Sequence, residues 1–195
     1  RSNTAVGDST LALLTTGDQN VAMGHNTMGK ATTATQNTCI GAGQVGSNVA
    51  CGYNITTGDM NTLMGAKCGT TMTTADQNTA VGGESLDAAT TGGYNSALGK
   101  ASLGAVTDGT YNTGIGFESG IDITTGDNNV CLGRNTTTGD SDSAGRVVIG
   151  FNVSGGSDYQ VTIGNDSVGK IQNNFNSNAT WARTSDIRFK KDVNT

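Results

Sequence analysis

Large side chains are scarce in this chain of 195 residues. It contains no proline, 5% aromatic residues and 34% hydrophobic residues, whereas glycine occurs 30 times. So few large apolar residues exclude the thick core of a compact globule. Abundant glycine, threonine and asparagine are typical of disorder, but disordered chains rarely keep their apolar residues in strict register, as this chain does. We therefore expect an ordered, repetitive structure.

The chain also lacks a long apolar run and a basic surface charge, which argues against membrane and nucleic-acid partners. No run of 18 apolar residues occurs, so we expect no membrane insertion. Residues 1–169 carry 14 acidic and 6 basic side chains, a balance of −8, and residues 170–195 carry 5 basic and 2 acidic ones, a balance of +3. An acidic body repels phosphate, so nucleic acid is not expected as a partner. The chain begins at Arg1 and shows no signal-peptide pattern, and we expect it to be part of a longer polypeptide.

Metal and acid–base chemistry lack the residues they need. The four cysteines form no C-x-x-C pair and have no histidine cluster beside them: Cys39, Cys51, Cys68 and Cys131. They occupy positions that elsewhere hold small residues, so we predict packing rather than a metal site, and no cofactor. His25 is the single histidine and is expected in an exposed turn, while Glu84 and Glu118 are too scattered for paired catalysis. The chain is therefore not expected to be an enzyme.

A five-residue unit recurs along the chain. It reads Asn, then Thr, Val or Ser, then a small residue, a large aliphatic residue and Gly. It starts at Asn3, Asn20, Asn37, Asn61, Asn78, Asn95, Asn112 and Asn129, and continues with the asparagine replaced at 146–150 and 160–164. The eight Asn starts lie 17 residues apart, except for 24 between Asn37 and Asn61, where residues 48–52 read as an extra copy. A fixed period of this kind indicates stacked repeats.

Each repeat is expected to contribute two short strands and two turns. Turn signals such as Thr15-Thr16-Gly17-Asp18 close the units, since Gly and Asp suit turns. Stacking at about 4.8 Å per coil predicts an all-β parallel β-solenoid or β-roll of about ten coils. The turn aspartates Asp18, Asp59 and Asp127 are expected to be solvated rather than to bind cations. Tyr94 and Tyr111, one coil apart, are expected to stack on each other, with sugar contact as the alternative.

Both faces of the repeated strand are expected to be covered. The large aliphatic position, Val6 in the first copy, is uniformly apolar, and the position before it, Ala5 in the first copy, is small and never charged. These two positions point to opposite faces because side chains alternate along a strand. We expect the large residues to fill the coil interior and the small ones to face sister chains. The prediction is a parallel homotrimer, with a dimer left open.

The repeated unit, as in Asn3-Thr4-Ala5-Val6-Gly7, resembles the head repeats of YadA-like trimeric adhesins, which also occur in phage tail fibres. The resemblance covers about residues 3–164 and implies a trimer of left-handed parallel β-rolls. The 17-residue period departs from the adhesin unit, which leaves the handedness open.

Residues 181–193, WARTSDIRFKKDV, resemble the start of the intramolecular chaperone that ends many phage tail fibres and endosialidase tailspikes. That family trimerises the fibre and then cuts itself off. By this resemblance Ser185 is the nucleophile and Lys190 its base, in a single-turnover self-cleavage beside Ser185. The alternative is a charged linker leaving the rod.

Together these features predict a structural shaft or head segment of a trimeric phage tail fibre that takes part in host attachment. Residues 1–164 form the rod, 165–184 a neck and 185–195 the start of the chaperone-like segment. The expected partners are two sister chains, other tail proteins and a host surface receptor, with a glycan among the candidates. The expected location is the virion. The alternative is the head of a bacterial trimeric autotransporter adhesin on the cell surface.

Overall fold

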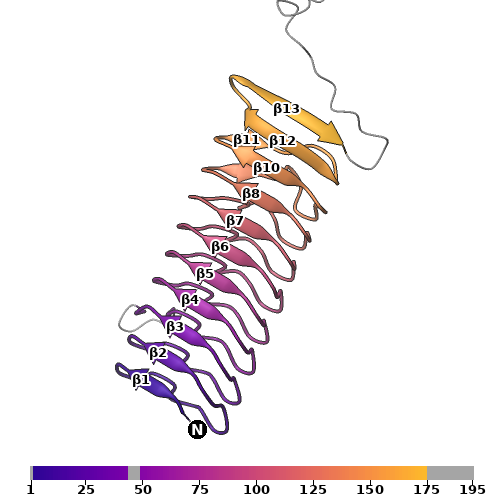
Figure 1. Ribbon diagram of the computed structural model, residues 1–195. Coiled ribbons are helices and arrows are strands. Elements are labelled where there is room, and N and C mark those ends of the chain that lie inside the picture. Colours follow the sequence, from indigo (N-terminus) through magenta and orange to yellow (C-terminus); the bar gives the residue numbers. More distant parts are fainter. Residues whose placement is uncertain (1, 44–48, 175–195) are drawn as a thin grey trace, which may run out of the picture.

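The chain forms a rod of stacked coils (Figure 1). The computed structural model describes residues 2–43 and 49–174, and within them the protein is all-β, with about nine solenoid turns. The strands are β1 (Thr4–Val6), β2 (Val21–Met23), β3 (Thr38–Ile40), β4 (Thr62–Met64), β5 (Thr79–Val81), β6 (Ser96–Leu98), β7 (Thr113–Ile115), β8 (Val130–Leu132), β9 (Thr136–Thr137), β10 (Val147–Gly150), β11 (Val153–Ser154), β12 (Gln160–Asn165) and β13 (Gly169–Asn174). The parallel β-solenoid predicted from the repeats is confirmed.

One long sheet runs the length of the rod. Strands β1 to β8, then β10 and β12, pair in parallel and in register, so that Ala80 of β5 lies beside Ala97 of β6. At the C-terminal end β13 pairs with β12 in antiparallel orientation and covers the last edge of the sheet. The described residues contain no helix, and therefore none that could cross a membrane.

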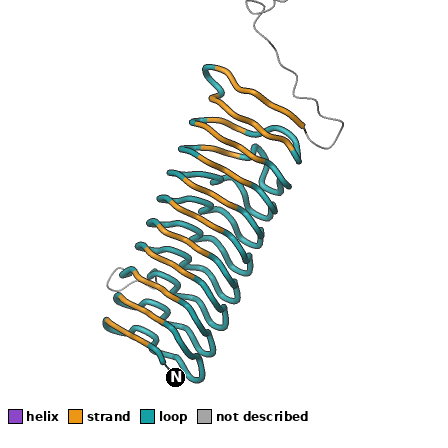
Figure 2. The backbone as a smooth tube through the Cα atoms, in the orientation of Figure 1, coloured by secondary structure: helices purple, strands orange, loops and turns teal. Residues whose placement is uncertain are grey.

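The prediction of two strands per repeat is wrong for most coils. A second sheet contains only β9 and β11, and the remainder of each coil is turn (Figure 2). Backbone conformation explains this: Glu84 and Leu86, with φ of 61° and 48°, both lie in the left-handed region. Two such residues so close together bend the chain away from the extended conformation that a strand needs.

The extra repeat predicted at residues 48–52 does not form an extra coil. Strand β3 pairs directly with β4 across the 24-residue interval, with Cys39 beside Leu63. Asn48 lies outside the described residues, and residues 49–52 contain no strand. Ile55 of this coil fills the same core row as Ala31 and Met72. The longer interval therefore adds no layer to the sheet.

The expected orientation of the strand side chains is reversed. The small position points into the solenoid: Ala22, Cys39, Ala80 and Cys131 are fully buried. The large aliphatic position points outward, with Met23, Leu98 and Ile115 each at least 40% exposed. A coil with one short strand has a narrow interior, and Leu86 and Val106 from the turns already fill it. Only small strand residues fit opposite them.

The asparagines that begin the strands form a buried ladder. Asn95 donates from Nδ2 to Asn78 Oδ1 at 3.2 Å and to the Gly109 carbonyl at 2.9 Å, and its own Oδ1 accepts the backbone N–H of Asn112 at 2.9 Å. The same pattern repeats at Asn20, Asn37, Asn61, Asn78, Asn112 and Asn129. The ladder therefore satisfies backbone groups that the turns would otherwise leave buried without a partner.

Candidate interaction surface

The outward face of the long sheet is an uncharged surface that runs along the rod. We define it by the two residues that flank the small residue of each repeat, called the first and third positions, such as Ser96 and Leu98 beside Ala97. The first position holds only Thr, Ser or Val and the third only Val, Met, Ile or Leu. The third-position side chains that are largely exposed are Val6, Met23, Met64, Leu98, Ile115 and Ile163. Monomeric soluble proteins rarely leave a continuous apolar band of this length open to water.

A row of side chains borders this face where each strand begins. This edge row consists of the residues just before the ladder asparagines: Gln19, Gln36, Met60, Gln77, Tyr94, Tyr111 and Asn128, then Gly145 and Tyr159. All of them adopt a left-handed backbone conformation, with φ between 56° and 64°. The predicted stacking of Tyr94 on Tyr111 is confirmed, with ring centroids 4.8 Å apart and an interplanar angle of 12°. Sequence reasoning found the tyrosines but not the conformation that aligns the row.

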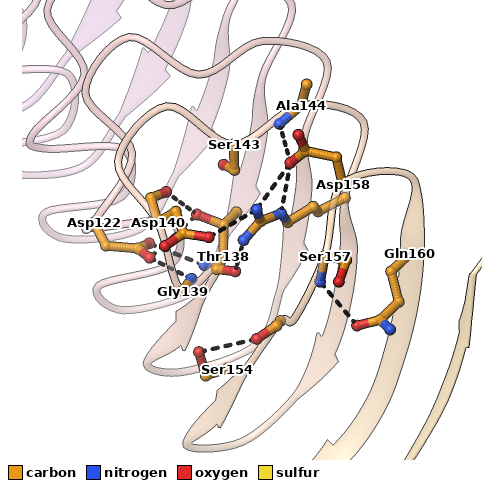
Figure 3. A network of polar contacts seen from close by, with 12 residues as sticks. Asp122, Thr138, Gly139, Asp140, Ser143, Ala144, Ser154, Ser157, Asp158 and Gln160 are labelled. Carbon is orange, nitrogen blue, oxygen red and sulfur yellow. Dashed lines mark hydrogen bonds and ion pairs between the residues drawn. The ribbon is translucent and has the colours of Figure 1, made fainter.

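A polar cluster ends the asparagine ladder (Figure 3). Arg146 takes the place of the next asparagine and is only 5% exposed. Its guanidinium donates to Asp158 Oδ1 at 2.8 and 3.0 Å, to the Thr138 carbonyl at 2.7 Å, and pairs with Asp140 at 2.8 Å. The Ala144 N–H, and after it Arg146, hold the pKa of Asp158 below its ordinary value. A buried cation with two carboxylates and a carbonyl is fully satisfied, so the cluster is structural.

The turn aspartates bond to the backbone of a neighbouring coil. Asp59 Oδ1 accepts the Thr35 N–H at 2.6 Å, and Asp127 Oδ1 accepts the N–H and hydroxyl of Thr110, both at 2.7 Å. Oxygens already occupied by N–H donors are poor ligands for a cation. In residues 2–43 and 49–174 no three His, Cys, Asp or Glu side chains gather as a metal site would require.

The four cysteines are free and buried, as their positions in the repeat predicted. Cys39, Cys51 and Cys68 lie in neighbouring coils. A hydrogen bond with the preceding thiol, Cys39 for Cys51 and Cys51 for Cys68, and burial raise the pKa of Cys51 and of Cys68. Burial, and then the charge of Asp122, raises the pKa of Cys131 to about 12. The thiols of Cys51, Cys68 and Cys131 are therefore neutral at physiological pH. Neutral, buried thiols are chemically unreactive.

The other residues considered for chemistry do not converge. His25 lies in a turn, as predicted, but it is half-buried rather than exposed, with Nε2 at 3.6 Å from Asp8 Oδ2. Glu84 pairs with Lys67 at 3.8 Å and Lys100 at 3.6 Å, and Glu118 lies two coils away in the same row. Ser185 and Lys190 lie outside the described residues.

Comparison with protein-family models, with curated proteins and with solved structures gave no match. The candidate functional feature is the surface that consists of the outward face and its edge row.

Proposed function

We propose that the chain is a shaft or head segment of a trimeric fibre, most economically a phage tail fibre, in which the outward faces of three copies pack together. The observation that carries the proposal is this uncharged face along a rod of ten parallel strands. Ten strands at about 4.8 Å give a band roughly 45 Å long. Burying it stabilises an assembly by about 25 cal/mol per Å² of apolar surface.

The solenoid suits a mechanical role. Each coil is bonded to the next through the sheet and the asparagine ladder, so the rod resists bending along its length. The resemblance of the repeats to YadA-like heads and of residues 181–193 to a fibre chaperone supports the tail-fibre setting. In this proposal Ser185 and Lys190 carry out the maturation cut, and other tail proteins and a host receptor are the partners in the virion.

The oligomeric state tests the proposal. Sedimentation velocity and light scattering of the purified 19.7 kDa chain should give three times that mass and a frictional ratio typical of a rod. A stable monomer at micromolar concentration would contradict the assembly.

The parent gene tests the setting. A chaperone domain encoded after Thr195 is expected for the fibre, whereas a C-terminal β-barrel anchor would assign the segment to a bacterial adhesin. Mass spectrometry of the full-length product should place its new C-terminus beside Ser185. A mature product that continues beyond Ser185 would remove the proteolytic role.

A further inference from the structure

The C-terminal part of the edge row has features of a ligand site that packing within the chain does not explain. Tyr94 has Tyr111 on one side and receives a hydrogen bond from Gln77 Nε2 at 3.0 Å on the other. Tyr111 has Tyr94 on one face only. In the next coil Asn128 takes its place in the row, and its short side chain is exposed. The second face of the Tyr111 ring is therefore not covered by another aromatic residue.

Tyr159 bounds the same interval from the other end. Its ring lies over Gly145, where an added Cβ would come within 2.7 Å of Tyr159 Cδ1. Both Tyr111 and Tyr159 are 55% exposed. Three coil steps of about 4.8 Å separate their backbones, roughly 14 Å in all, and only the amide of Asn128 and the backbone of Gly145 lie between them in the row. The result is two half-exposed rings with an amide between them.

The carboxylates next to Asn128 and Tyr159 in the sequence already accept hydrogen bonds within the rod. Asp127 accepts two hydrogen bonds from Thr110, and Asp158 binds Arg146 and the Ala144 N–H. The edge row itself carries no charged residue from Gln19 to Tyr159. Such a row offers no cation to an anionic ligand, and the carboxylates that lie near it repel one. Tyrosine rings and amides instead match the apolar faces and hydroxyl groups of a sugar.

The site is also preorganised. The left-handed backbone at Tyr111 and Tyr159, with φ of 58° and 57°, is fixed by hydrogen bonds to neighbouring coils. Stacking restricts the Tyr111 ring further. Side chains that are already ordered lose little entropy when a ligand binds. A weakly binding oligosaccharide therefore gains most from rings placed in this way.

We propose that Tyr111, Asn128 and Tyr159 form a binding site for a neutral oligosaccharide that lies along the edge of the rod. Tyr111 and Tyr159 stack on sugar rings and the Asn128 amide hydrogen-bonds to hydroxyl groups. The inference deepens the proposed attachment role by naming the receptor chemistry. Its test does not depend on the oligomeric state, so the failure of one proposal can be told from the failure of the other.

The test is an array of neutral and acidic oligosaccharides probed with the purified chain, followed by calorimetric titration of the strongest neutral ligand. Tyr111→Ala and Tyr159→Ala should each weaken that affinity by about tenfold, as the loss of a central aromatic contact does. Phe117→Ala is the matched control, because Phe117 is 41% exposed at the opposite end of the same strand, β7. It should leave the affinity unchanged.

Four results would overturn the proposal: no binding on the array, binding to acidic glycans alone, an equal loss of affinity in Phe117→Ala, or a change of sedimentation coefficient in Tyr111→Ala. The last would show that a second copy of the chain covers the ring. Circular dichroism of each variant checks the fold, and the Tyr159 variant keeps the test decisive if the Tyr111 variant is unstable.

Discussion

At the scale of single residues, the strand-ending glycines show how closely the coils approach each other. Gly82 has φ of +143°, and an added Cβ would clash with the carbonyl oxygen of Gly99 in the next coil. Gly83, the next residue in the chain, has ordinary φ, and its added Cβ would meet only the Ala66 carbonyl oxygen at 3.7 Å. Glycine is therefore required at position 82, whereas position 83 has room for a larger residue.

Gly82→Ala should lower the free energy of unfolding by more than about 2 kcal/mol, because both the backbone conformation and the space exclude a side chain. Gly83→Ala should be neutral or stabilise by about 0.4–1 kcal/mol through the unfolded state. Urea denaturation followed by circular dichroism measures both. Equal changes in the free energy of unfolding for the two variants would show that the close approach of the coils does not exclude a side chain at Gly82.

The ladder asparagines make a second prediction at this scale. Asn95→Ala leaves the Gly109 carbonyl and the Asn112 N–H without their partner inside the rod, while Asn78 Oδ1 keeps only the backbone N–H of residue 95. Each unsatisfied buried group costs about 1–3 kcal/mol, so we expect a loss of several kcal/mol in urea denaturation. Thr74→Ala, in an exposed turn, is the control and should have almost no effect. A small loss at Asn95 would mean that water replaces the amide.

At the scale of the coil, packing is shared between the strand and the turns. In β4 the strand position that is small in most coils holds Leu63. Leu63 fills the space beside Gly52 and Gly69, at turn positions where other coils have Met28 or Leu86. In the next coil the sizes are exchanged, with Ala80 in the strand and Leu86 in the turn. Of these two positions, one coil has its large residue in the strand and the next coil has it in the turn.

Leu63→Ala should therefore cost about 2–5 kcal/mol by opening a cavity. Adding Gly69→Leu should recover part of that loss, because Leu86 and Leu103 already adopt the left-handed conformation of Gly69. Gly69→Leu alone should destabilise, since its Cβ would lie 2.8 Å from Leu63 Cδ1. Thermal denaturation of the single and double variants measures the coupling, and additive effects would contradict shared packing.

The Arg146 cluster gives the C-terminal coils a pH dependence. The pKa of Asp158 is lower in the folded chain than its ordinary 3.8, so its ionised form favours folding. This stability is complete well above pH 3.8 and is lost as the pH falls through the lowered value. The protection factors of β10 and β12 in hydrogen exchange should fall as the pH drops below 3.8, and Asp158→Asn should flatten this pH profile. Asp142→Asn, at an exposed turn position, should leave it unchanged.

The sequence predicted the coils but not which way their side chains point. The 17-residue period predicts the stacking, because residues that recur at a fixed spacing can pair in register in successive coils. The intervals of 24 and 14 residues keep the same register. Alternation put Asn95 and Ala97 on one face and Ser96 and Leu98 on the other, but both faces lack charge, so hydrophobicity could not tell inside from outside. The asparagine indicates which face is inside, because a polar residue that repeats on the same face as the small residues forms a buried ladder. The spacing of the repeats could not predict why Arg146 replaces the asparagine, because its role depends on contacts with Thr138, Asp140 and Asp158.

At the scale of the whole molecule, the exposed aliphatic residues of the outward face determine whether the rod is a monomer or part of an assembly. Leu98 and Ile115 lie in neighbouring strands near the middle of the sheet and are 51% and 43% exposed. A lysine at either position keeps its charge in water in a single rod but would be buried between rods. Leu98→Lys and Ile115→Lys should therefore dissociate the assembly to monomers in sedimentation velocity, while circular dichroism still reports a β-solenoid. Thr74→Lys, in an exposed turn away from the strands, should leave the mass of the assembly unchanged. If the two outward-face variants keep that mass, the sister chains do not meet on this surface and another face of the rod must hold them.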